Sequence, residues 1–210
     1  MKTRYTSLFV TIFVMIFMYL PIVMLISQSF NESRYGGKWM GFSLKWYEAL
    51  FRDSAVINAT LNTLLVAFVA TALSTAIGTC AAWTLNKYRL SKLQSAHYVL
   101  IYAPMCVPDI LMGISLLLMF VSLKVDLGLT TVILAHTTFC LSFVTFTVLA
   151  RLQDFDFNII QAAQDLGAGN FRIFVKIILP LLAPGIAAGA MMAFTLSMDD
   201  FVVTFFVGGP

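Results

Sequence analysis

Charged residues are scarce in this sequence. Asp, Glu, Lys and Arg make up 11% of its 210 residues, whereas 60% are hydrophobic and the mean hydropathy is +0.91. A soluble domain carries about 25% charged residues, so the composition excludes an ordinary soluble fold and indicates an integral membrane protein. The net charge of +3 is small and dispersed along the chain, which argues against a nucleic-acid partner.

Paired cysteines and clustered metal ligands are also lacking. Cys80, Cys106 and Cys140 lie in different apolar runs without paired spacing, which is typical of small packing residues. His97 and His136 have no partner at metal-ligand spacing, and we interpret each as a structural or interfacial histidine. We therefore expect no metal site and no cofactor.

Catalytic motifs are absent as well. No glycine-rich run ends in Gly-Lys-Ser/Thr, because Gly36-Gly37-Lys38 leads into Trp39. Neither a Ser/His/Asp arrangement nor an HExxH arrangement supports an intramembrane protease. We therefore predict a protein that is not an enzyme, and any ATP that drives it must be hydrolysed by another polypeptide.

Long apolar runs are what the sequence does contain. Each is long enough to cross a hydrocarbon core of roughly 30 Å, which takes about 20 helical residues. We therefore predict an all-α polytopic membrane protein with one transmembrane domain over 1–210. The first run could instead be a cleaved signal peptide, but it is longer than a signal's apolar core and no A-x-A site follows. The five predicted spans cover about residues 8–26, 61–85, 98–123, 127–150 and 181–207.

A mixed polar segment, 31–59, separates the first two spans. Apolar and aromatic residues recur in it at helical spacing, so we expect a short interfacial helix there. The residues that predict this helix are Leu44, Tyr47, Leu50 and Phe51.

The segment 152–180 lies between the fourth and fifth spans but cannot itself cross a bilayer, because polar and charged residues interrupt it. A first short helix is predicted in it, with Asn158 as its cap and Gln161 reaching back in the manner of a capping box. Gly167 is expected to end this helix, since glycine adopts the left-handed conformation. The predicted apolar face consists of Phe155, Ile159, Ala162 and Leu166.

A second short helix is expected after the glycine, and Pro180 is expected to close it. Two short amphipathic helices joined at a glycine make a compact knob, which suits docking into a groove on a soluble partner. An ordinary amphipathic connector lying in the membrane interface is the alternative. The apolar side of the second helix is predicted to consist of Phe171, Phe174, Val175 and Ile178.

The order A-A-x-x-L-G-A followed by I-x-L-P resembles the EAA cytoplasmic loop of ABC-importer permeases. Gln161 stands where the family motif begins with glutamate, which removes one charge. The resemblance implies a MetI-like helical bundle whose loop fits a cleft on a dimer of ATP-binding subunits and transmits its closure. The match runs through Ala162, Ala163, Leu166, Gly167, Ala168, Ile177, Leu179 and Pro180.

Basic residues orient the spans. Lys2 and Arg4 precede the first span, the short loop 86–92 is densely basic, and the segment 152–180 falls on the same side. Cytoplasmic loops carry the excess of Lys and Arg. We therefore predict a multi-pass protein with its N-terminus and the 152–180 loop in the cytoplasm, and the resemblance to ABC-importer permeases implies that the membrane is a bacterial inner membrane.

Three aspartates lie inside the predicted spans. Asp109 follows Pro108 in the third span, which Pro104 and Pro108 are expected to break, and Asp199 and Asp200 lie in the outer third of the fifth. A charged side chain at mid-bilayer costs about 2.5–3.5 kcal/mol on insertion scales, so it seldom faces lipid. We hypothesise that these acids line a pathway for a cationic substrate. Alternatively, they cap broken helices or pair with basic residues of a partner.

The acids extend the resemblance to the C-type permeases of the spermidine/putrescine importers, over nearly the whole chain. This resemblance implies polyamine transport through a pathway shared with a second, different permease, and delivery by a periplasmic substrate-binding protein. Another small cationic or amine-bearing solute is the alternative substrate, and a secondary transporter or a structural membrane protein is the alternative class. The matching segments are 46–51 before 62–64, 108–110, 194–200, 202–203 and the Gly-Gly-Pro end.

Importer permeases of this group usually carry a further span. With five visible spans, the chain looks shorter than the family pattern, and a natural variant, a truncation and a fragment are each compatible with that difference.

Overall fold

The structure is a computed structural model that describes residues 2–34, 36–88, 93–153 and 155–209. These residues form helices, and their only strand-like feature is an isolated bridge between Asn31 and Phe42. The predicted all-α fold class is confirmed. Arg89 and Lys92 of the predicted basic loop, and Pro210, lie outside the described residues. Whereas the sequence predicts one domain, the chain divides into two compact units, Met1–Thr60 and Leu61–Pro210.

The first unit holds α1 (Lys2–Ser29), α2 (Lys45–Arg52) and the start of α3 (Ser54–Lys87). The side chains of residues 5–28 are exposed within the chain, so this apolar helix needs lipid or another protein to cover it. Helix α2 confirms the predicted short helix. Buried Asn31 organises the connection between α1 and α2: its Nδ2 donates to the Lys38 carbonyl at 2.8 Å.

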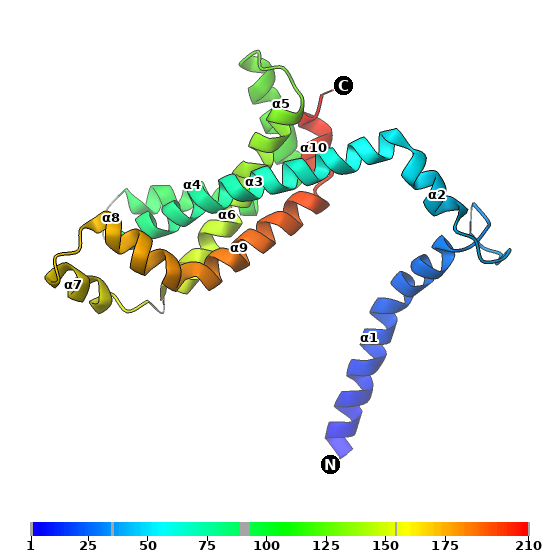
Figure 1. Cartoon of the computed structure of the whole chain (residues 1–210), viewed down its shortest axis with the longest axis horizontal. Helices are drawn as coiled ribbons and strands as arrows, with labels where there is room; N and C mark the ends of the chain where they lie inside the picture. Colours follow the sequence, from blue (N-terminus) through cyan, green and yellow to red (C-terminus); the bar gives the residue numbers. More distant parts are fainter. Residues whose placement is uncertain (1, 35, 89–92, 154, 210) are drawn as a thin grey trace. The chain divides into compact units, whose positions relative to one another are not determined.

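The second unit holds the rest of α3 and all later helices. Their order in the chain is shown by the colours in Figure 1. They are α4 (Gln94–Cys106), α5 (Asp109–Ser122), α6 (Leu129–Gln153), α7 (Asn158–Asp165), α8 (Asn170–Ile173), the π-helix η1 (Phe174–Ile178), α9 (Leu179–Asp199) and α10 (Val202–Val207).

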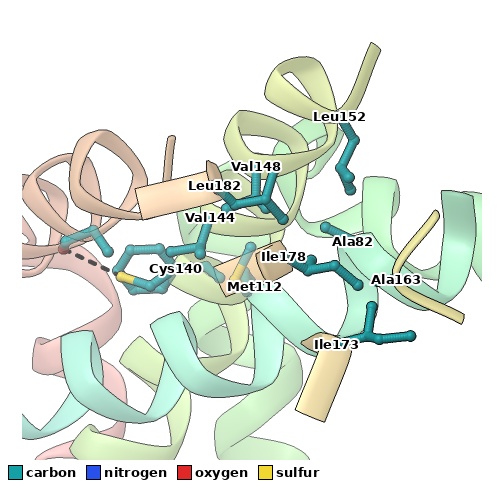
Figure 2. Close-up of a cluster of buried hydrophobic side chains, with 12 residues drawn as sticks. Ala82, Met112, Cys140, Val144, Val148, Leu152, Ala163, Ile173, Ile178 and Leu182 are labelled. Carbon is teal, nitrogen blue, oxygen red and sulfur yellow. Dashed lines mark hydrogen bonds between the residues drawn. The ribbon is translucent and has the colours of Figure 1, made fainter. Parts of the chain in front are cut away.

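Helix α6 is the centre of this unit. It carries more buried residues than any other described helix and packs along α9, while α4, α5 and α10 also contact it. Figure 2 shows side chains from α6 meeting those of α9 and η1 in the larger apolar cluster. The members of this cluster that come from α6, η1 and α9 include Val144, Val148, Leu152, Ile178 and Leu182.

Two glycines in α9 allow the close approach of α6. A Cβ atom at Gly185 would lie 2.8 Å from the Arg151 Cβ, and one at Gly189 would lie 3.3 Å from the Val144 Cα. The spacing Gly185-x-x-x-Gly189 is the small-residue pattern that lets helices in membranes pack backbone to backbone. Dispersion contacts along this seam therefore fix α9 against α6.

The predicted spans correspond to the long helices, with two differences. Four described helices are long and apolar enough to cross a membrane, and α4 with α5 forms a pair bent by 112°. Counting the bent pair as one broken span gives the predicted five. The break occurs at Pro108, because the residue before a proline is driven out of the helical conformation, and Val107 has ψ 129°. The break expected at Pro104 is wrong, since Pro104 lies inside α4.

The second difference concerns the fifth span. It was predicted as one run over 181–207, but α9 ends at Asp199 and the separate helix α10 begins at Val202. The physical reason is the carboxylate of Asp200, which accepts hydrogen bonds from backbone N–H groups of α10 and so begins a new helix.

Because the α6–α9 seam tolerates no side chain at Gly185, Gly185→Ser should destabilise the protein. Overpacking of this kind costs about 1–3 kcal/mol, so the thermal unfolding midpoint of the purified protein in detergent should fall by several degrees. Gly128→Ser is the matched control, because a Cβ atom there meets nothing within 4 Å. Equal midpoints for the two variants would contradict the close packing described here.

Candidate functional site

The predicted glycine turn of the 152–180 loop is present. Helix α7 ends at a Schellman motif: the Gly167 N–H donates to the Gln164 carbonyl at 2.8 Å, and the Ala168 N–H donates to the Ala163 carbonyl at 3.0 Å. Gly167 has φ +80°, the left-handed conformation that favours glycine. The prediction that Gly167 ends the first short helix is confirmed.

The predicted cap of α7 is wrong. Asn158 is the first residue of the helix and makes no side-chain cap, whereas the Asp156 Oδ1 accepts the Asn158 N–H at 2.9 Å. The buried face is also shifted by one residue, because Ile160 and Ala163 pack against the core while Ile159 and Ala162 are exposed. The carboxylate of Asp156, two residues before the helix, therefore caps α7 in place of the predicted Asn158.

The second helix of the loop does not close at Pro180. It runs from α8 through the π-helix η1 directly into α9, so the 30 residues Asn170–Asp199 form one continuous apolar helix. The wider π-turn brings Ile173 and Ile178, five residues apart, to the same buried side. A π-turn is also one of the adjustments that accommodate a proline, which lacks a backbone N–H, inside a membrane helix.

Two large apolar side chains at the tip of the loop are left uncovered. Leu166 is 90% exposed and Phe171 is 82% exposed, one on each side of the glycine turn. Polar and charged residues of the same loop, such as Gln161 and Arg172, are exposed as well. Exposed apolar side chains rimmed by polar ones mark a surface that binds a partner.

The loop is anchored to the rest of its unit by aromatic contacts. The ring of Trp83, near the end of α3, lies 6.5 Å from that of Phe157 and 6.2 Å from that of Phe174. A pocket of about 310 Å³ lies beside these rings, with Asn86 and Lys87 in its wall. The loop is therefore held by α3 as well as by its covalent connections to α6 and α9.

The three aspartates predicted to lie along a pathway are brought together. Asp109, at the start of α5, and Asp199 and Asp200, at the end of α9, line one pocket of about 340 Å³. No lysine or arginine is among the described residues that line this pocket. Aromatic and aliphatic side chains complete the wall, namely Phe139, Phe143, Leu196, Phe201, Val202 and Val203.

The two adjacent acids have different surroundings. Asp199 is exposed, as is Asp109, so both carboxylates are open to whatever enters the pocket. The Asp200 side chain is only 10% exposed, and its oxygens accept the Val203 N–H at 3.3 Å and the Thr204 N–H at 3.1 Å. Of the pair, Asp199 is therefore the exposed member in the pocket wall, whereas Asp200 is held by the backbone of α10.

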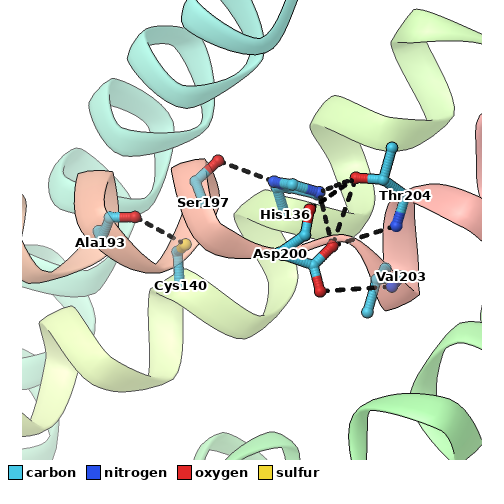
Figure 3. Close-up of polar contacts among 7 residues, drawn as sticks. All are labelled: His136, Cys140, Ala193, Ser197, Asp200, Val203 and Thr204. Atoms are coloured by element: carbon cyan, nitrogen blue, oxygen red, sulfur yellow. Dashed lines mark hydrogen bonds and ion pairs between the residues drawn. The ribbon is translucent and has the colours of Figure 1, made fainter. Parts of the chain in front are cut away.

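Asp200 also contacts a histidine on α6 (Figure 3). The His136 Nε2 lies 3.2 Å from the Asp200 Oδ2 and 2.9 Å from the Thr204 Oγ1, while its Nδ1 lies 2.7 Å from the Ser197 Oγ. Because a carboxylate only accepts hydrogen bonds, the contact assigns a hydrogen to Nε2. His136 is 1% exposed, so its ring is shielded from solvent.

Sequence reasoning did not find this network. His136 was interpreted as a lone structural or interfacial histidine, and its partners are 61 and 68 residues away in the chain. Only the spacing of Ser197, Asp200 and Thr204, three and four residues apart, could have indicated a shared polar side of this segment. Among the described residues, no group of three metal-ligating side chains is close enough to hold a metal ion.

Comparison with known proteins places this geometry in context. Residues 74–210 match the family described as binding-protein-dependent transport system inner membrane component. The spermidine/putrescine transport system permease protein PotC of Haemophilus influenzae is 43% identical over 193 residues, which cover 92% of this chain and 75% of that protein.

Two relatives from Escherichia coli K12 are similar over the same share of the chain. The spermidine/putrescine transport system permease protein PotC is 44% identical over 194 residues, covering 92% of this chain and 73% of that protein. The putrescine transport system permease protein PotI is 40% identical over 200 residues, covering 92% of this chain and 71% of that protein.

Proposed function

Because the chain belongs to the family of binding-protein-dependent transport system inner membrane components, we propose that it imports polyamines as the permease subunit of an ATP-driven importer. The relatives named for spermidine and putrescine transport support this substrate class. The observation that carries the proposal is the gathering of Asp109, Asp199 and Asp200 around one pocket with aromatic walls.

The chemistry of that pocket suits a polyamine. Such a substrate carries ammonium groups separated by methylene chains, so it needs carboxylates at intervals and apolar surface between them. The exposed carboxylates of Asp109 and Asp199 would each accept an ammonium group, and the rings of Phe139 and Phe143 would cover the methylenes and attract the charge through their faces. Asp200 would contribute negative potential while its oxygens hold the start of α10.

The 152–180 loop would couple the pocket to ATP. Its exposed tip, formed by Leu166 and Phe171, would enter a cleft on a dimer of ATP-binding subunits. The continuous helix Asn170–Asp199 then joins this tip to the acid pair over about 45 Å, at 1.5 Å per residue. The proposed coupling residues are Gln161, Ala162, Ala163, Leu166, Gly167, Ala168 and Pro180.

A packed helix of that length would transmit displacement with little loss, because protein interiors have low compressibility. Closure of the ATP-binding subunits would tilt α9 and open the acid pocket outward, and hydrolysis would return it. This is alternating access, driven by a motor outside the chain.

The remaining partners follow from the same proposal. A second, different permease would complete the pathway, and a periplasmic substrate-binding protein would deliver the polyamine. The chain is an inner-membrane component, and we place its N-terminus and the 152–180 loop in the cytoplasm because the basic residues gather there.

Neutralising the exposed acids should abolish most of the transport. Asp199→Asn and Asp109→Asn each remove a charge-assisted hydrogen bond worth about 1.5–3 kcal/mol, so uptake of labelled spermidine by cells carrying the whole transporter should fall about tenfold or more. Asp126→Asn, an exposed acid outside the pocket, is the control and should leave uptake unchanged. Wild-type uptake in both Asp199→Asn and Asp109→Asn would refute the proposed pathway.

The glycine turn should be needed for coupling. Gly167→Ser forces a non-glycine residue into the left-handed conformation, which costs about 1–2 kcal/mol, and should lower substrate-stimulated ATP hydrolysis by the assembled transporter several-fold. Gly169→Ser is the matched control: Gly169 precedes α8 with φ −71°, a helix cap position that serine fills well. Full stimulation in Gly167→Ser would argue that the loop does not couple hydrolysis to transport.

A further inference from the structure

The fifth apolar segment breaks where its acids reach the pocket. Helix α9 ends at Asp199 and α10 begins at Val202, so helical hydrogen bonding is interrupted between them. Lipid offers no partner to the freed backbone groups, and a break at membrane depth therefore needs partners from within the protein. The Asp200 carboxylate supplies part of that need by accepting two N–H groups of α10.

One side chain from another helix reaches both sides of the break. The imidazole of His136 contacts Ser197 in the last turn of α9, Asp200 within the break and Thr204 in the first turn of α10. Figure 3 shows the ring lying between these three residues. Because α6 is itself fixed along α9 by the glycine seam, the ring holds the break from a rigid base.

We propose that His136 is a positioning residue for the substrate acids: it fixes the angle of the α9–α10 break and thereby the places of Asp199 and Asp200 in the pocket. It acts through Asp200 and does not touch substrate, since it is 1% exposed and is not among the residues that line the pocket. The inference rests on the proposed function for the identity of the substrate, but not for the geometry of the break.

Stability alone does not explain a histidine at this position. Replacing a buried polar group and its partners by apolar residues of similar volume is often neutral or stabilising, whereas a fully satisfied buried network specifies one geometry. Both ring nitrogens of His136 have partners, and those partners belong to both helices and to the acid between them. The network therefore has the contacts expected of one that fixes the angle between α9 and α10.

The consequence for transport is selectivity by length. Asp109 lies on α5 and Asp199 on α9, so the separation of the two exposed carboxylates depends on the angle that His136 fixes. A change in that separation should favour one spacing of ammonium groups over another. Loss of the His136 contacts should therefore alter the ratio of spermidine to putrescine uptake, beyond any common loss of activity.

The geometric claim can be tested without reference to the substrate. In the assembled transporter, with exposed Cys80 and Cys106 replaced by serine, Asp199→Cys reports the place of residue 199 through its rate of modification by a thiol reagent. His136→Leu should change that rate at least threefold, and His136→Gln, which keeps part of the hydrogen bonding, should change it less. Thr145→Val, buried in the same helix with a hydroxyl that donates to the Leu141 carbonyl of that helix, lies outside the network; it is the matched control and should leave the rate unchanged.

Uptake then tests the consequence for selectivity. With Asp199 restored, His136→Leu should change the ratio of spermidine to putrescine uptake at least threefold, while Thr145→Val leaves the ratio unchanged. In Asp200→Asn, His136 has lost the carboxylate through which it acts. Adding His136→Leu to that variant should therefore change the ratio of spermidine to putrescine uptake less than twofold relative to Asp200→Asn alone. The same shifts in Thr145→Val as in His136→Leu, or an unchanged labelling rate in His136→Leu, would overturn the proposal.

The two proposals can fail separately. If the wild-type transporter imports neither amine, the proposed substrate class is wrong, and the labelling rates still decide whether His136 positions residue 199. If the amines are imported but neither the labelling rate nor the uptake ratio changes in His136→Leu, only the positioning role is wrong.

Discussion

The close packing of α9 on α6 is the constraint on which the rest of this structure depends. Gly185 and Gly189 present no side chain to α6, so the two helices approach to the distance at which backbone and Cβ atoms touch. In a membrane no hydrophobic force drives helices together, and such dense contact is what holds them. The seam fixes the one helix that joins the exposed loop tip to the acid pair, and it places His136 and Phe139 of α6 beside those acids.

A second constraint separates two acids that look equivalent in the sequence. An apolar surrounding makes every unpaired polar group costly, so a carboxylate there is either bound internally or kept open for a ligand. Asp200 takes the first course, through Val203, Thr204 and His136. Asp199 instead ends α9 with its side chain exposed at the pocket, where we propose that it meets the substrate. One residue thus maintains the break, and its neighbour is exposed beside it.

The sequence predicts the features that local chemistry determines. Apolar runs of spanning length, the break at Pro108 and the left-handed Gly167 each depend on a few adjacent residues, and each is found. Where several local solutions compete, sequence reasoning fails: Asp156 caps α7 in place of Asn158, and a π-turn carries the helix past Pro180. The assembly of the acid pocket was expected only in outline, and the His136 network was missed, because both arise from helix packing between residues more than 60 positions apart.

The central claim is that the loop tip meets a separate ATP-hydrolysing subunit on the cytoplasmic side of the membrane. Cross-linking from a cysteine at Leu166, which is 90% exposed, tests it most directly. In a transporter whose exposed native cysteines are replaced, Leu166→Cys should cross-link to the ATP-binding subunit, with a yield that changes when ATP is added. Modification of that cysteine by a membrane-impermeant thiol reagent applied from the periplasmic side, without any cross-link to the ATP-binding subunit, would contradict the account.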